Sequence, residues 1–445
     1  MFRQIACLRL WLSSWLLFLA LTSGYASTLV AADFYAGPRD YREFLPRLKA
    51  GDRLFLRSGD YLRGLPLHHL QGEPGRPIVI AGPETGEPAR FIARAGANTV
   101  SLVDVRHIHI RHLELDGGNK SVDAVKAEGH ANYAHFVTLE NLYIHDHAAS
   151  QQNVGISTKC PAFGWIIRGN RIERVGTGMY FGNSDGRAPF IAGLIEDNQI
   201  SDTVGYNLQI KHQLPRPAGL PAAGERHDSV IRRNLFSKAT GGGQGPLARP
   251  NVLVGHWPTS GDGEHDRYLI YANLFWQNPT ESLFQGEGNL ALYNNIFVTA
   301  GADAVRIQPH NDVPREVRIL FNSVVAAGNG ISVTEPEPNP YRQVVAGNVV
   351  FAARPMQGGL RQHNFTGSHI SAGRHLFRPH AELALFDLTP QAAINANQRL
   401  DAAWLRNLPD IERDYAGQVR PPLAIGARVG AAAVSSSVSG SAKQP

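Results

Sequence analysis

The stretch GWIIRGNRIERVG, residues 164–176, sets apolar side chains on both sides of a single asparagine, Asn170. The same order recurs along the chain: an apolar run, a polar pair, an asparagine, and a short apolar segment before a turn. The asparagines of this repeat are Asn141, Asn170, Asn198, Asn234, Asn273, Asn295, Asn322 and Asn348. They follow one another at intervals of 22 to 39 residues, which is the period of a solenoid whose coils stack on each other.

The repeat predicts strands with no helices between them, and therefore an all-β fold. A single right-handed parallel β-helix of about nine or more coils suits this pattern best. The segment HIHIRHLELDGG (107–118) fits one step earlier, with His112 in the asparagine position. Because an asparagine tolerates left-handed backbone geometry and its amide both donates and accepts, we expect these side chains to form an inward-facing ladder.

The composition and the two ends of the chain agree with an exported, turn-rich β protein. The 445 residues include 45 glycines and 28 prolines, and only 18% are charged. Residues 1–27 have the basic start, the apolar run (10–21) and the small residues of a signal peptide, although a retained anchor is the alternative. We therefore expect a secreted or periplasmic protein with one domain over 33–430 and a disordered tail over 431–445. Cleavage removes Cys7 and leaves Cys160 alone, so no disulfide can form within the chain.

The segment 33–82 contains an amphipathic pattern around 41–48, with Tyr41, Phe44, Leu45 and Leu48 at helical spacing. Such a helix would cap the open end of the stack. The segment, with AGDRLFLRSGDY (50–61) and GEPGRPIVIAG (72–82), resembles the N-terminal cap of secreted right-handed β-helix proteins of the pectate-lyase-like superfamily. Residues 388–397 and 414–427 resemble the closing motif of that superfamily. The resemblance implies the fold more strongly than any one activity.

The charge balance points to an acidic partner. The net charge is +5 and the isoelectric point about 9.2, which suits an acidic polysaccharide. The sequence has no run of lysine and arginine that would mark a nucleic-acid-binding protein. We expect no membrane association after signal cleavage, and a monomer.

A second strand follows each asparagine strand, and its side chains alternate between the core and the outside. The inward set includes Ile156, Met179, Leu208, Val252 and Val305. The outward set and its neighbours form a polar and cationic column from coil to coil. We predict that substrate is bound there by Lys159, Tyr180, Gln209, His212, Trp257, Glu287 and Arg306.

The longest intervals of the repeat contain three insertions, at 214–227, 241–250 and 258–266. Insertions in a solenoid map to loops on one face, which is often the binding face. Basic residues lie on or beside these loops: Lys211, His212, Arg216, Arg226, His227, Arg249, His256 and His265. The sequence therefore predicts one basic cleft, several coils long, for an extended acidic sugar chain.

The segment LQIKHQ (208–213), followed one coil later by VGHWP (254–258), loosely resembles the chondroitinase B and alginate lyase family. The resemblance implies β-elimination with Lys211 as the base, because neighbouring cations depress the pKa of a lysine. His256, Arg226 and His227 would neutralise the uronate carboxylate and protonate the leaving oxygen. The chain departs from the family where it has His256 or Trp257 in place of the expected arginine.

Two other functions remain open from the sequence. A glycoside hydrolase needs two carboxylates about 5 to 10 Å apart, and Glu225 with Asp228 or Glu264 with Glu287 are possible pairs. A carbohydrate-binding protein without activity would keep only the scaffold.

Metal signals are limited to two short segments. GDGEHD (261–266) offers Asp262, Glu264, His265 and Asp266, and its carboxylates suit Ca²⁺ as a possible cofactor. YIHDH (143–147) offers His145, Asp146 and His147. A solvated loop tip is the plainer interpretation of the first segment.

Overall fold

The computed structural model describes residues 31–221 and 226–430. The predicted signal peptide, Glu225 and the predicted tail lie outside the described residues. Within them nearly all regular secondary structure is β-strand, and the only α-helices of the described residues are two short ones, α1 (Tyr41–Phe44) and α2 (Ala402–Leu405). None of the helices in this part of the chain is both long enough and apolar enough to cross a membrane.

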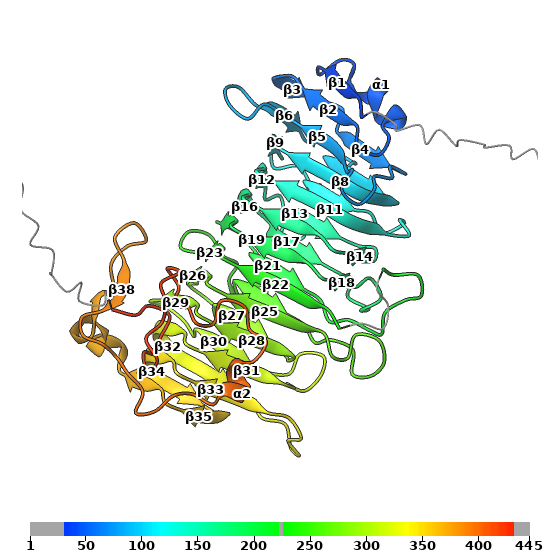
Figure 1. Cartoon of the computed structure of the whole chain (residues 1–445). Coiled ribbons are helices and arrows are strands. Elements are labelled where there is room, and N and C mark those ends of the chain that lie inside the picture. The colour runs from blue at the N-terminus through cyan, green and yellow to red at the C-terminus, as the bar shows by residue number, and fades with distance from the viewer. Residues whose placement is uncertain (1–30, 222–225, 431–445) are drawn as a thin grey trace, which may run out of the picture. The chain divides into compact units, whose positions relative to one another are not determined.

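The strands form three parallel rows, and successive coils add one strand to each (Figure 1). The first row is a fifteen-stranded sheet in which β14 (Ala162–Phe163) and β18 (Phe190–Ile191) lie off the main path. The remaining thirteen strands of the described chain each belong to one coil. Its strands are β1 (Asp33–Ala36), β2 (Arg53–Leu56), β5 (Ile78–Ala81), β8 (Val105–Arg111), β11 (Ala134–Glu140), β15 (Ile166–Arg168), β19 (Leu194–Glu196), β22 (Asp228–Arg232), β25 (Arg267–Tyr271), β28 (Leu290–Tyr293), β31 (Val317–Leu320), β33 (Gln343–Ala346) and β35 (Leu360–Gln362).

The other two rows are joined into one sheet by two long strands, β32 (Ser323–Val333) and β34 (Val349–Gln357). The second row starts after the asparagine turn and contains β3 (Gly59–Tyr61), β6 (Ala89–Ile92), β9 (Leu113–Asp116), β12 (Tyr143–His147), β16 (Arg171–Val175), β20 (Gln199–Ser201), β23 (Leu235–Ser237), β26 (Leu274–Trp276), β29 (Ile296–Thr299) and β36 (Phe365–Gly367). The third row contains β4 (Leu65–His68), β7 (Val100–Val103), β10 (Val125–Ala127), β13 (Val154–Thr158), β17 (Thr177–Phe181), β21 (Leu208–Ile210), β24 (Val252–Val254), β27 (Phe284–Gly286) and β30 (Val305–Ile307). The fold is the right-handed parallel β-helix that the repeat predicts.

The core lies between the three rows. The side chains predicted to point inward from the third row, from Ile156 through Met179, Leu208 and Val252 to Val305, are all fully buried. Each coil buries only part of its apolar surface, so stacking on the next coil completes the core.

The asparagine ladder exists, and it runs from Asn170 to Asn364. Each side-chain Nδ2 donates to Oδ1 of the asparagine in the next coil at 2.8 to 3.1 Å, through Asn198, Asn234, Asn273, Asn295, Asn322 and Asn348. The ladder also extends one step beyond the repeat read from the sequence, because Asn364 in QHNF accepts from Asn348.

Two predicted members of the ladder were wrong. Glu140 pairs with Arg168, so Leu142 rather than Asn141 lies opposite Asn170. Asn141 is exposed, with a positive φ of 53°, and His112 has the equivalent place with a φ of 54°. The left-handed geometry therefore belongs to the residue before the ladder position, such as Gly169 or Asp197.

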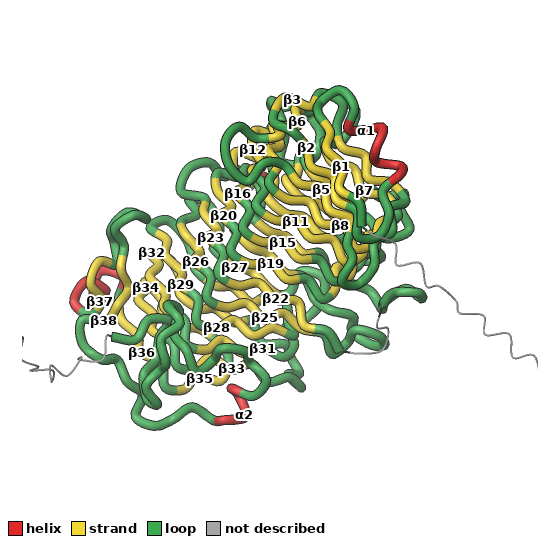
Figure 2. Tube along the Cα trace, turned by 45° about the horizontal axis from the view of Figure 1, so that its top comes forward, coloured by secondary structure: helices red, strands yellow, loops and turns green. Residues whose placement is uncertain are grey.

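Both ends of the described chain close the stack. Tyr41 of α1 packs edge-on against Tyr61 and Phe91, with ring centroids 5.1 and 5.7 Å away. The predicted capping helix is confirmed but short, because a 3₁₀ turn (Leu45–Arg47) with a proline in its first turn follows α1 at once. At the other end, residues 376–430 run back along the last coils and bring α2 against the first row (Figure 2). The antiparallel pair β37 (Leu376–Arg378) and β38 (Asp387–Pro390) belongs to this segment.

Candidate functional site

The third row carries an open groove that gathers three lysines. Its volume is about 580 Å³, and we call it the lysine groove. Among the residues that line it are Asn98, Asp123, Lys126, Gln151, Lys159, Tyr180, Ser184, Tyr206, Gln209, Lys211 and Arg249.

Strand register explains why these side chains meet. Lys126 of β10 pairs with Ser157, which pairs with Tyr180, which pairs with Gln209, so the four form one outward column. Lys159 and Lys211 directly follow β13 and β21 and extend a second column beside the first. Gly182 lies between them and leaves room, since a Cβ there would lie 3.3 Å from the Cβ of Lys211.

The electrostatics of the groove make its lysine amines easier to deprotonate. Burial lowers the pKa of Lys159 to about 8, and the charges of Lys126 and Lys211 add to this effect while Asp123 opposes it. Burial also lowers the pKa of Lys211. The Nζ atom of Lys159 lies 3.6 Å from the ring centroid of Tyr180. An amine with such a pKa can accept a proton near neutral pH.

A single carboxylate lines the described part of the groove. Asp123 is buried and forms an ion pair with Lys126 at 3.2 Å. Its oxygens also accept from the Ser157 hydroxyl at 3.1 Å and the Val154 backbone N–H at 2.9 Å. Asp123 therefore holds the groove together, and the lining offers no second carboxylate with which it could perform acid-assisted hydrolysis.

One wall of the groove comes from the predicted insertion at 241–250. A 3₁₀ turn (Gly245–Leu247) in this loop is anchored by Gln151, whose Nε2 donates to the Leu247 carbonyl at 2.7 Å. The loop brings the Arg249 guanidinium carbon to 5.9 Å from the Tyr206 ring centroid. Burial raises the pKa of Tyr206, so its phenol stays protonated.

Two residues predicted to face substrate are in the interior instead. Trp257 has 0% exposed surface and stacks on Tyr268 with ring centroids 4.5 Å apart. Glu287 also has 0% exposed surface. Its carboxylate accepts the backbone N–H groups of His256, His310, Asn311 and Asp312. The prediction that Trp257 and Glu287 point outward was therefore wrong, and the hydrolase pair of Glu264 with Glu287 is lost with it.

Three more predicted residues lie outside the lining of the lysine groove. His256 is buried, with its Nδ1 2.7 Å from the Trp257 carbonyl oxygen, and its ring lies 5.4 Å from that of His212. Burial and the neighbouring charges of His256 and Lys211 lower the pKa of His212. Arg306 forms ion pairs with Glu281 at 3.4 Å and Asp303 at 3.5 Å.

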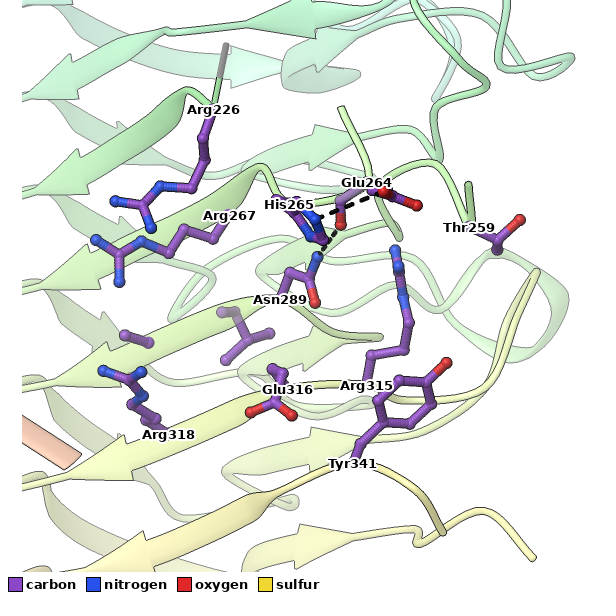
Figure 3. A pocket seen from close by; sticks show the side chains of 12 residues that line it. Arg226, Thr259, Glu264, His265, Arg267, Asn289, Arg315, Glu316, Arg318 and Tyr341 are labelled. Carbon is purple, nitrogen blue, oxygen red and sulfur yellow. Dashed lines mark hydrogen bonds and ion pairs between the residues drawn. The ribbon is translucent and has the colours of Figure 1, made fainter. Parts of the chain in front are cut away.

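The predicted single basic cleft is in fact divided between two rows. Arg226 and His227 lead into β22 of the first row, and the His227 ring packs edge-on against Phe163 at 5.1 Å. Arg226 lines a different groove, with a volume of about 500 Å³ (Figure 3). We call it the arginine groove; its lining includes Arg226, Glu264, His265, Arg267, Asn289, Leu290, Ala291, Arg315, Glu316, Arg318 and Tyr341. Grouping Arg226 and His227 with Lys211 was therefore wrong.

One predicted Ca²⁺ ligand of the GDGEHD segment is already bound by protein groups. Asp266 is buried, and its carboxylate binds Arg216 and accepts the His227 backbone N–H at 2.7 Å. The Asp266 carboxylate therefore does not join Asp262 and Glu264 as a third ligand for a metal ion. The one group of three metal-type ligands within 4.8 Å of each other in the described chain is Asp116, His145 and Asp146. There His145 and Arg174 already bind Asp146, at 2.7 and 2.8 Å.

Lys126, Asp123 and Tyr206 are site residues that the sequence reasoning missed. Lys126 lies in the short alternation Val125–Lys126–Ala127 of β10, one coil before β13, which carries Ile156 at the start of the predicted inward set. This three-residue pattern was the only signal for it. Tyr206 lies in the loop before β21 and gives no periodic signal.

No family model and no curated protein matches the sequence. Among solved structures, the XylC–xylose complex matches with a TM-score of 0.58 at 9% identity, over 89% of this chain and 98% of that one. The alginate lyase AlyGC matches with a TM-score of 0.49 at 12% identity, over 75% of this chain. The match spans about half of that lyase. The GH136 lacto-N-biosidase from Eubacterium ramulus matches with a TM-score of 0.43 at 13% identity, over 76% of this chain and 68% of that one. At these identities the likeness concerns the fold alone, which is the right-handed parallel β-helix.

Proposed function

We propose that this chain is an exported polysaccharide lyase that cleaves an acidic, uronate-containing glycan by β-elimination in the lysine groove. The observation that carries the proposal is the convergence of Lys126, Lys159 and Lys211 on one open groove, with the pKa of Lys159 lowered to about 8. The fold itself accommodates a sugar in at least one neighbour, XylC, whose structure contains xylose.

In the proposed reaction the neutral amine of Lys159 removes the proton on C5 of a uronate residue. The electron pair of that C–H bond forms the C4–C5 double bond, and the bond from C4 to the glycosidic oxygen breaks. The phenol of Tyr180, which lies under Lys159, gives its proton to the leaving oxygen. Lys126, Lys211 and Arg249 bind the uronate carboxylate, whose charge would otherwise keep the C5 proton weakly acidic.

The first test is the near-ultraviolet absorbance of the mature chain incubated with alginate, pectate, chondroitin sulfate and hyaluronan. Each polymer is tested with Ca²⁺ and with a chelator, because the sequence predicts Ca²⁺ as a possible cofactor. A rise in absorbance reports unsaturated uronate ends. Replacing Lys159 by alanine should lower kcat about 10²- to 10⁴-fold, the usual contribution of a general base. The control is Lys120→Ala, which removes an exposed lysine outside the groove lining.

The variants also separate the two candidate bases. If Lys211→Ala lowers kcat as strongly as Lys159→Ala while KM stays unchanged, Lys211 takes part in the chemistry. If Lys211→Ala raises KM alone, it binds the carboxylate. A flat absorbance trace on all four polymers would refute elimination on these substrates and leave carbohydrate binding without cleavage as the better account.

A further inference from the structure

The arginine groove of the first row has no part in the proposed elimination. Figure 3 shows the side chains of Arg226, Arg267 and Arg318 one below another along one side of it. Arg267 belongs to β25 and Arg318 to β31, and the strand between them is β28. Ala291 of β28 pairs with both Leu269 and Arg318, so the floor between the arginines is small and apolar.

The positive charges on this side are only partly neutralised. Asp228 binds Arg267 through two hydrogen bonds of 2.7 and 3.0 Å, while Arg226 lies 4.0 Å from the same carboxylate. Arg318 donates to two backbone carbonyls, those of Trp404 at 3.3 Å and Arg406 at 3.0 Å. Burial and the charges of Arg267, Arg342 and Arg226 lower the pKa of Arg318. Arg226 and Arg267 therefore share one carboxylate, and Arg318 is held by backbone carbonyls.

Arg315 lines the opposite side of the groove beside Tyr341 (Figure 3). It is only 6% exposed, and its Nε has no hydrogen-bond partner among the described residues. Within residues 31–221 and 226–430 its one acceptor is the Trp257 carbonyl, at 2.6 Å from an Nη atom. A buried guanidinium without a carboxylate partner is costly unless a ligand supplies the negative charge.

Acceptors for hydroxyl groups are present as well. Glu316 and Asn289 line the groove between the two arginine sides, and Glu264 lies at its upper edge near His265 (Figure 3). A small inorganic anion would use the arginines alone. A sugar acid would use the arginines for its carboxylate and the carboxylates and amide for its hydroxyls, with its apolar face over Leu290 and Ala291.

We propose that the arginine groove is a second binding site, for a uronate-containing oligosaccharide, and that it binds without cleaving. The proposal takes the class of ligand from the proposed function and is otherwise independent of it. The described lining holds no lysine that could act as the base does in the lysine groove, so the elimination is not assigned there.

The test measures calorimetric binding of tetramers of mannuronate, guluronate and galacturonate to the full mature chain. The protein carries Lys159→Ala with Lys211→Ala, which remove two cations of the lysine groove. We expect binding of at least one tetramer to survive, and to weaken at least tenfold when Arg226→Glu is added. Arg226 is 49% exposed at its side chain, so the substitution should be tolerated by the fold. Arg63→Glu, an exposed arginine of the N-terminal coils, makes the same change in net charge and should leave binding unchanged.

A second variant, Glu316→Gln, keeps shape and removes the charged hydroxyl acceptor; it should weaken tetramer binding without introducing repulsion. The proposal is overturned if no tetramer binds, if Arg226→Glu has no more effect than Arg63→Glu, or if inorganic sulfate binds with the affinity of the tetramers. Arginine-dependent binding, together with a flat absorbance trace for the unsubstituted chain on every polymer, would refute the proposed function and leave the second site standing.

Discussion

At the scale of single residues, the proposed chemistry depends on the lowered pKa of one amine, that of Lys159. Lys159 is half-buried between two other lysines, and its only acidic neighbour of consequence, Asp123, is already bound to Lys126, Ser157 and a backbone N–H. The negative charge of Asp123 therefore pairs with Lys126 rather than with Lys159. This arrangement keeps the pKa of Lys159 low without leaving Asp123 free to raise it.

This setting predicts the pH dependence of catalysis. The base must be neutral, so kcat/KM should rise with pH along a limb whose midpoint is near 8. Lys126→Met removes a positive neighbour and frees Asp123, and both changes raise the pKa of Lys159. The limb should therefore move to higher pH. Profiles of kcat/KM from pH 6 to 10 check this, and an unmoved limb in Lys126→Met would assign it to another group.

The same residue should lower the stability of the fold. An unfolded lysine has a pKa near 10.4, above the value of about 8 in the folded chain, so the unfolded state binds more protons between these pH values. The destabilisation is full below pH 8 and fades as pH rises towards 10.4. Lys159→Met should therefore raise the thermal midpoint at pH 7 and do so less at pH 10. Equal effects at both pH values would show that packing, and not the charge, is responsible.

Residues just beyond a strand are where sequence reasoning failed. Within the strands of the third row, where each residue pairs with the next coil, the inward–outward alternation correctly predicted which side chains are buried. Gly286 is the last residue of β27, and Glu287 follows it with its carboxylate turned inward to backbone N–H groups. Trp257 comes three residues after β24 and packs on Tyr268. The inward–outward alternation of side chains ends where the strand ends. It therefore cannot predict which way Glu287 or Trp257 points.

At the scale of elements, the asparagine ladder should be a main source of stability. The Nδ2 of Asn234 donates to Ile195 O, Arg232 O and Asn273 Oδ1, and its Oδ1 accepts from Asn198. Asn234→Ala leaves several buried groups unpaired and should cost roughly 3 kcal/mol. Unfolding in urea, read from the midpoint at unchanged slope, measures this.

The matched control is Asn141→Gly. Asn141 stands outside the ladder, is exposed, and has a positive φ that glycine adopts without strain. Its substitution should change stability by no more than about 0.5 kcal/mol. A large loss of stability in Asn141→Gly, or none in Asn234→Ala, would mean that the ladder is not a main source of stability.

The insertions show what the repeat can and cannot predict about elements. Their positions and lengths follow from the spacing of the asparagines. Which side of a coil they cover does not, because that depends on anchors far apart in the sequence. The loop at 241–250 is held over the third row by Gln151, 96 residues away from Leu247. The loops at 214–227 and 258–266 are joined by the buried pair Arg216 and Asp266 and supply Arg226 and Glu264 to the first row.

At the scale of the whole molecule, residues 31–430 share one apolar core cluster that runs from Ala36 to Ala352, with a second cluster under the C-terminal segment. A continuous core of this kind lets the outward faces vary without loss of the fold. This explains why the sequence predicted the architecture so much better than the site. The core repeats in every coil, whereas each groove is built once, from residues of several coils.

The net charge of +5 and two cation-lined grooves predict a strong effect of salt on substrate binding. The Debye length falls from about 30 Å at 0.01 M to about 8 Å at 0.15 M ionic strength. Attraction between partly exposed cations and an acidic polymer should therefore weaken, while the neutral Lys159 amine is little affected. KM for the cleaved polymer should rise several-fold between 10 and 150 mM NaCl, with kcat nearly constant. Lys126→Met together with Lys211→Met should flatten this dependence, and Lys120→Ala should not. A KM independent of salt in the parent protein would mean that the groove recognises its substrate through hydroxyl groups, and would favour a neutral glycan over an acidic one.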